Sequence, residues 1–337
     1  MRPRGRAPRH RRVIDAATWV NYLLRRSSGF SGAHTTGILL IFRKPMLSLR
    51  TVATVVGLTC FTATLAHEFW LEAPRFRLKP GQTVNIHTFI GANFKGEPWT
   101  TKAAKVQRLV RYGPAPADST DLTPTPGFAP TDTFRTTFTF AQPGTHVVLL
   151  RSTNSFIELP AEQFTAYLRE EGLDYALRLR QEQDQQARPG RETYRRCAKT
   201  LVQVGEANTT AAASDSTYRQ IFGLPLELVP EQNPYHLSTD KSLTVRVLRA
   251  GKPAFGVAVQ VWQRQSGGLS TTHFTTRTNQ NGRVLLRLSG PGPYLLAVVD
   301  MIDAPAGLRD RADWQSTWAS LTFAGPPVLT SRPKAKH

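Results

Sequence analysis

The residue best suited to chemistry in this sequence is His67, which directly follows an apolar segment. If the chain is cleaved before it, His67 carries a free α-amino group beside its imidazole, and both groups lose their protons near neutral pH. Together they can chelate a borderline metal ion such as copper, nickel or cobalt. A third nitrogen, from His146 or His87, would complete a T-shaped site, so these three histidines are the candidate metal ligands.

The alternative is a purely structural role for His67, at the start of a strand anchored by the apolar residues 69–71. After residue 66 the sequence has no His-x-His, His-x-x-x-His or Cys-x-x-Cys motif. The six histidines in this part of the chain are an ordinary number for its length.

Three carboxylates lie near His67 in the sequence: Glu68, Glu72 and Glu97. They are candidate oxygen ligands, or partners that orient the ligands. Exposed salt bridges to Arg75 or Lys95 are the simpler interpretation.

The residues before His67 have the layout of a secretory signal peptide over 46–66. Met46–Arg50 is a short cationic start, Thr51–Ala66 has no charged residue, and small residues occupy positions −3 and −1 before His67. The apolar run has 16 residues, whereas a spanning helix needs about 20. We therefore expect a Sec-exported chain in the periplasm or another extracytoplasmic compartment, with no membrane span after cleavage.

Residues 1–45 differ from the rest of the chain, with ten Lys and Arg against the single acid Asp15. A signal peptide normally begins close to its methionine, so Met46 is a candidate start and 1–45 would be upstream reading frame. A long basic leader that begins at Met1 is the alternative.

Residues 1–66 supply +10 of the net charge of +19, because residues 67–337 carry 32 Lys and Arg against 23 Asp and Glu, a net charge of +9. A basic exported domain can contact anionic lipid or glycan. No Lys/Arg cluster is interleaved with aromatic residues, which argues against nucleic-acid binding. Cys197 is the single cysteine after residue 66, so an intramolecular disulfide is excluded.

An N-terminal β domain is predicted over 67–157. Pro80-Gly81 separates two alternating runs within 74–90, and further strands are expected at 106–112, 133–140 and 146–152.

A helical insert with a return strand is predicted over 158–205. Helices are expected at 160–171 and 173–186, and a third around Cys197, because Tyr194, Cys197, Ala198 and Leu201 have the spacing of one helix face.

A C-terminal β-sandwich is predicted over 223–323, followed by a tail over 324–337. Short runs rich in β-formers, separated by turn residues, recur at 224–230, 243–248, 257–262, 271–278, 284–288, 294–299 and 317–323. The turns resemble those of transthyretin-like or carboxypeptidase-regulatory sandwiches. The expected fold is therefore mainly β, with two Ig-like or transthyretin-like sandwich domains and a helical insert between them.

Seven separated segments carry a resemblance to a known family. They are His67–Glu72, Phe94–Glu97, Pro143–Val147, Phe164–Gly172, Tyr194–Lys199, Gly223–Pro230 and Trp318–Phe323. Together they resemble an uncharacterised bacterial periplasmic family labelled as a NikM-like component of nickel or cobalt uptake. The resemblance implies metal handling beside a membrane transporter. It also favours His146 over His87, because His146 lies in one of these segments.

No catalytic motif accompanies these segments. The sequence has no Gly-x-Ser-x-Gly elbow, phosphate-binding loop or dinucleotide fingerprint. The adjacent carboxylates Glu170 and Glu171 are predicted to lie on a solvated helix face. An oxidative copper site at His67 is the one enzymatic alternative, and we expect no catalytic activity.

The function expected from the sequence is an exported periplasmic binding protein. It would handle nickel, cobalt or copper through His67 for a membrane transport partner. The alternative is a non-catalytic structural or interaction module of the cell envelope that binds glycan or protein, with Trp262 and Trp318 as a candidate glycan platform.

Overall fold

The computed structural model describes residues 68–100, 103–115, 117–124, 136–206, 215–237, 242–265 and 271–326. His67, the segments predicted over 1–45 and 46–66, and the tail beyond 326 lie outside these residues. All of the described residues belong to one compact unit.

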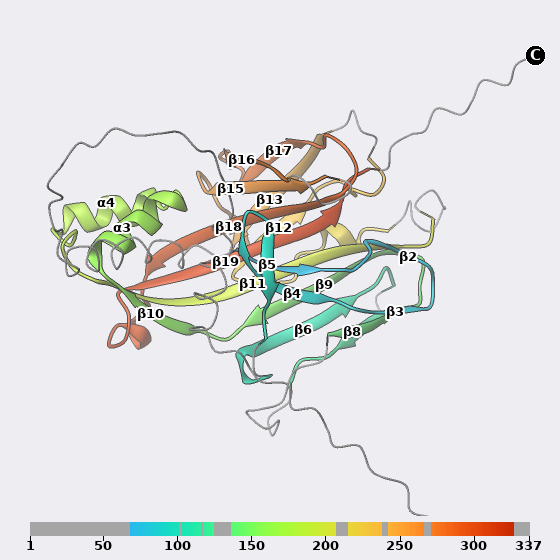
Figure 1. Cartoon of the computed structure of the whole chain (residues 1–337), viewed down its shortest axis with the longest axis horizontal. Helices are drawn as coiled ribbons and strands as arrows, with labels where there is room; N and C mark the ends of the chain where they lie inside the picture. The colour runs from blue at the N-terminus through green and yellow to red at the C-terminus, as the bar shows by residue number, and fades with distance from the viewer. Residues whose placement is uncertain are drawn as a thin grey trace, which may run out of the picture. The chain divides into compact units, whose positions relative to one another are not determined.

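The described residues are mainly β (Figure 1). The strands are β1 (Glu68–Glu72), β2 (Arg77–Leu78), β3 (Gln82–Asn85), β4 (His87–Ala92), β5 (Lys95–Pro98), β6 (Val106–Tyr112), β7 (Ser119–Asp121), β8 (Thr137–Phe140), β9 (Gly144–Ser152), β10 (Ser155–Leu159), β11 (Gly190–Val204), β12 (Leu226–Pro230), β13 (Ser242–Arg249), β14 (Lys252–Pro253), β15 (Ala258–Arg264), β16 (Thr271–Arg277), β17 (Arg283–Arg287), β18 (Pro293–Asp303) and β19 (Trp314–Ala324). The α-helices are α3 (Ala161–Glu170) and α4 (Asp174–Glu182), as predicted for 160–171 and 173–186.

One ten-stranded sheet runs through both predicted β regions. Its order is β16-β15-β18-β19-β11-β9-β6-β7, and β10 and β2 also pair with β11. The N-terminal and C-terminal strands meet where β11 pairs with β19 in parallel, from Glu192 opposite Trp314 to Thr200 opposite Thr322. β11 is therefore the strand that joins the two halves of the sheet.

The two faces of this sheet have different cover. On one face, Val259, Val298 and Leu321 share a core with Leu228 and Val245 of the four-stranded β12-β13-β14-β17 sheet, which makes a β-sandwich. Side chains alternate between faces along a strand, so the neighbouring residues point to the opposite side.

Two smaller cores lie on that opposite side. Val299 and Met301 pack against Phe164 of α3, and Trp262 packs against Trp70 of the β1-β4-β5 sheet. The two helices and the β1-β4-β5 sheet thus cover different parts of this face of the ten-stranded sheet.

A buried ion pair connects the two sheets of the sandwich. Lys199 Nζ on β11 donates to Glu227 Oε1 on β12 at 2.9 Å, and both side chains are almost fully buried. Glu227 also accepts from the backbone N–H groups of Phe222 and Leu224. Burial lowers the pKa of Lys199, and the charge of Glu227 opposes that shift.

The helix predicted around Cys197 is wrong, because residues 190–204 form β11. Every residue from Cys197 to Val204 is buried, since β19 and β9 flank the strand and both of its faces are covered. A strand buried on both faces loses the alternation of apolar and polar residues. Its apolar residues can then match the spacing of a helix face by chance.

We expect Lys199→Met to lower the free energy of unfolding by about 3–5 kcal/mol, because Glu227 would stay buried without its countercharge. Adding Glu227→Gln should recover part of that loss. Urea denaturation measures both, with the exposed Lys95→Met as the matched control. A Lys199→Met variant as stable as the control would contradict this account of the sandwich.

A second prediction concerns the docking of α3 on β11. A Cβ atom at Gly190 would lie 2.1 Å from the ring of Phe164, far inside van der Waals contact. We expect Gly190→Ala to lower the melting temperature, and Phe164→Leu to restore part of it by making room. Thermal unfolding of the single and double variants tests this contact.

Candidate functional site

The structure places His146 in a closed polar network. Its side chain is fully buried in β9, Nδ1 lies 2.9 Å from Nη1 of Arg111, and Nε2 lies 2.8 Å from the carbonyl oxygen of Gln142. Arginine can only donate, so Nδ1 accepts and Nε2–H donates. Burial lowers the pKa of His146. A metal ion at His146 would have to displace one of these two partners.

His87 lies exposed on β4, opposite Glu72 of β1. Glu68, the residue next to His67 in sequence, pairs with Gly91 at the other end of the same two strands. Four residues of strand correspond to about 13 Å, so His87 is distant from Glu68. The described residues contain no group of three or more His, Cys, Asp or Glu side chains that could hold a metal ion.

The carboxylates near His67 have different partners from those predicted. Glu72 forms an ion pair with Arg264 of β15 at 2.7 Å and accepts from the indole N–H of Trp70. Glu97 is exposed on β5. In the described part of the chain, none of these carboxylates forms a salt bridge to Arg75 or Lys95. Glu72 is paired instead with Arg264 of the ten-stranded sheet.

Three carboxyl groups are buried on the helix-covered side of the ten-stranded sheet. Glu68 of β1, Glu171 at the end of α3 and Glu192 of β11 are 8, 6 and 2% exposed. The prediction that Glu171 is solvated is therefore wrong. It follows the last residue of α3, where the chain turns back over β15 instead of continuing along the exposed helix face.

These carboxyl groups are only partly satisfied by neighbours. Nε2 of Gln260 donates to Glu171 at 3.0 Å, and Glu192 accepts from the hydroxyls of Tyr167 and Ser316. Oε2 of Glu68 is buried without a hydrogen-bond partner.

The pKa values of all three groups are raised. Burial is the main cause, and it raises the pKa of Glu68 to about 7, of Glu192 to about 7 and of Glu171 to about 8. The charges of Glu68 and Glu170 raise the pKa of Glu171 further. Buried groups with strongly shifted pKa values are typical of functional sites.

Local packing explains why Glu68 and Glu171 come together. Thr322 donates its hydroxyl to the carbonyl oxygen of Leu71, which fixes β1 over the sheet. Gly172 has a φ of 66°, a conformation that suits glycine, and a Cβ there would lie 3.1 Å from that of Ala258. The turn after α3 is therefore held against β15, beside Gln260.

A family model, described as a domain of unknown function (DUF4198), matches residues 64–301. The chain belongs to this family. The match spans β1, both helices and most of the ten-stranded sheet, so it includes all three buried carboxylates. The predicted resemblance to an uncharacterised family is thus confirmed, and that family is DUF4198. The match does not extend to the NikM-like label. No curated protein matches this chain.

Solved structures show only a weak likeness. Trypsin-activated α-2-macroglobulin from Escherichia coli is 13% identical, with 78% of this chain and 16% of that chain covered and a TM-score of 0.20. The elastase-activated form has the same identity and TM-score, with 20% of that chain covered. The outer capsid protein Hoc of bacteriophage RB49 is 9% identical, with 78 and 71% covered and a TM-score of 0.18. Likeness at this level carries no argument about function.

The buried carboxylates predict how stability depends on pH. The ordinary pKa of a glutamate is 4.5, so between about pH 4.5 and 8 the folded protein keeps protons that the unfolded chain has lost. The stability that these groups contribute is complete below pH 4.5 and is lost as the pH rises through 7–8. We expect the free energy of unfolding to fall over this range, by about 1.4 kcal/mol per pH unit for each retained proton.

Glu171→Gln should make this slope shallower, and it should stabilise the protein above pH 8. Urea denaturation at pH 5, 7 and 9 measures the effect, with the exposed Glu162→Gln of α3 as the matched control. An unchanged slope in Glu171→Gln would show that Glu171 titrates normally.

Proposed function

We propose that this DUF4198 protein is an exported, non-catalytic binding protein that holds a copper, nickel or cobalt ion at the start of β1. The α-amino group and imidazole of His67 would be the principal ligands. The ion would be passed to, or protected for, a membrane transport partner. One observation carries the proposal: Glu68 and Glu171 are both buried, the charge of Glu68 acts on Glu171, and neither is paired with a Lys or Arg among the described residues.

The electrostatics of this pair favour a cation. Neither Glu68 nor Glu171 forms an ion pair with a described Lys or Arg. Burial away from water raises the pKa of both carboxyl groups. A positive charge placed between them would stabilise both ionised carboxylates. The residue that precedes Glu68 in the chain is His67, whose free amino group and imidazole would supply nitrogen ligands for such an ion.

The absence of a complete donor set among the described residues fits this proposal. Two carboxylates alone do not hold a borderline metal ion well. His87 lies at the far end of the β1–β4 pair from Glu68, and both ring nitrogens of His146 already have partners. The mature N-terminus is therefore the part of the site that the proposal requires.

The test is a metal titration of the exported protein after its N-terminus has been determined. We expect a chain that begins at His67 and binds one equivalent of copper or nickel by calorimetry. One added alanine before His67 should abolish binding, because it removes the amino group from the chelate ring. Glu171→Gln should weaken binding about tenfold, while the exposed Glu97→Gln should leave it unchanged.

Two outcomes would contradict the proposal. The chain could begin at another residue, or it could begin at His67 and bind no metal ion. Either outcome would leave an interaction module of the cell envelope as the better proposal. Trp262 would not be its glycan platform, because that side chain is only 2% exposed.

A further inference from the structure

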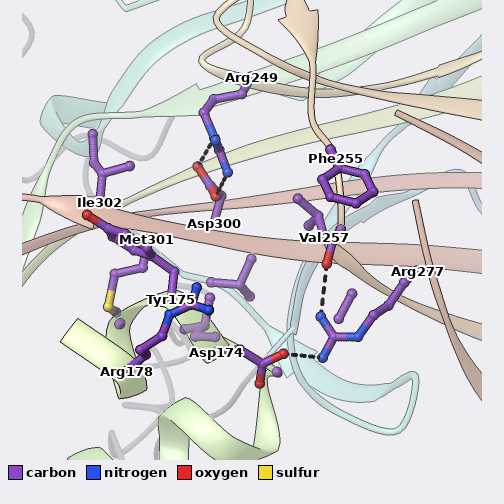
Figure 2. A pocket seen from close by; sticks show the side chains of 16 residues that line it. Asp174, Tyr175, Arg178, Arg249, Phe255, Val257, Arg277, Asp300, Met301 and Ile302 are labelled. Atoms are coloured by element: carbon purple, nitrogen blue, oxygen red, sulfur yellow. Dashed lines mark hydrogen bonds and ion pairs between the residues drawn. The ribbon is translucent and has the colours of Figure 1, made fainter. Parts of the chain in front are cut away.

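A solvent-open cleft of about 610 Å³ lies beside the helices, and neither Glu68 nor Glu171 is among its lining residues. The start of α4 forms one wall, the turn before β15 forms another, and β18 contributes the floor (Figure 2). This volume is within the range of small-molecule sites, about 300–1,000 Å³.

The charged groups of the cleft are three arginines and two aspartates. Arg249 binds Asp300 through two of its nitrogens, and Arg277 reaches across from β16 to Asp174 of α4 at 2.8 Å. Arg178 lines the cleft with no hydrogen bond or ion pair in the described part of the chain. The cleft therefore has one guanidinium without a countercharge.

These groups define the polar chemistry of a ligand. An arginine paired with an aspartate presents N–H donors and carboxylate acceptors along one edge, which suits a hydroxyl because a hydroxyl both donates and accepts. The unpaired Arg178 suits a carboxylate, which matches the planar fork of its guanidinium. A ligand with several hydroxyls and one carboxylate satisfies both requirements.

Exposed apolar side chains gather at the same cleft. Phe255, Tyr175 and Ile302 are 68, 50 and 39% exposed, and they are three of the seven large apolar side chains exposed among the described residues. Tyr175 and Arg178 are three positions apart on α4, so they share one helix face. An aromatic ring beside a guanidinium can cover the face of a ring-shaped ligand while its acid group is bound.

We propose that this cleft binds an acidic saccharide, with its carboxylate on Arg178, its ring against Tyr175 and Phe255, and its hydroxyls on the Arg249–Asp300 and Arg277–Asp174 pairs. None of the side chains assigned to the saccharide is assigned to the metal ion. The cleft gives the protein a second ligand, of a class that carries both negative charge and hydroxyl groups.

The experiment is isothermal titration calorimetry of the exported chain at low salt in the presence of EDTA. The probes are digalacturonate, its neutral counterpart digalactose, and sodium phosphate. We expect digalacturonate to bind at least tenfold more tightly than digalactose or phosphate, and its affinity to fall as salt is added.

Variants locate the site. Arg178→Gln should weaken digalacturonate binding at least tenfold and leave weak digalactose binding unchanged, and Tyr175→Ala should weaken both sugars about fivefold. The matched controls are Arg287→Gln and Leu285→Ala on β17, which are exposed and do not line the cleft. Each control should change the dissociation constant less than twofold.

Three results would overturn the proposal. These are equal affinity for the acidic and neutral sugars, no binding of digalacturonate at 10 mM, or an Arg178→Gln variant that binds it like the unaltered chain. Phosphate that binds as tightly as digalacturonate, with the same dependence on Arg178, would mean a simple anion site and would also overturn it. Because EDTA is present throughout, none of these results depends on metal binding.

Discussion

The buried ion pair between Lys199 and Glu227 is the interaction on which the sandwich depends. It joins β11, the strand that unites the two halves of the large sheet, to β12 of the smaller sheet. A charge removed from water must be matched closely by its partner, so the pair tolerates little displacement of the two sheets. The apolar residues around it set how much surface is buried. The ion pair sets how the two sheets are positioned. It therefore also constrains where the side chains on the opposite face of β11 lie.

That opposite face carries the unusual chemistry of the molecule. The covering elements leave polar side chains between them: β1 contributes Glu68, the end of α3 contributes Glu171, and β11 contributes Glu192. Each carboxyl group has lost water without gaining a full set of partners, which a purely structural interior rarely accepts. A protein that needs a site for a cation can keep such groups, because the missing partner is then the ligand itself. The cleft beside α4 differs in kind, since it is open to solvent and rich in arginine.

Much of the strand pattern could be predicted from the sequence, and much of the site could not. Residues 137–140 alternate polar and apolar side chains and are followed by the turn pair Pro143-Gly144, so the local sequence suffices to identify β8. The part of β11 around Cys197 was predicted as a helix, because a strand covered on both faces has no period of two, whereas the predicted return strand lies within β11. The burial of Glu171 depends on Gly172 and on the approach of Ala258, almost ninety residues away. The two ring nitrogens of His146 are occupied by hydrogen bonds to Arg111 and Gln142. Such contacts are set by sheet topology, which spacing in one chain does not encode. His67 lies outside the described residues, so its role stays a prediction.

The parallel pairing of β11 with β19 also constrains the order in which the protein can fold. The paired residues are 122 positions apart, so their contact closes a long loop, whereas β18 with β19 and β9 with β11 pair across shorter separations. High contact order of this kind slows folding, because the chain loses the conformational entropy of loop closure before the contacts within the sheet can stabilise it. A chain that is synthesised N-terminus first cannot complete its central sheet until β19 has emerged from the ribosome. Until then β11 exposes the strand edge that β19 later covers, so a partly synthesised chain is prone to edge-to-edge association with other chains.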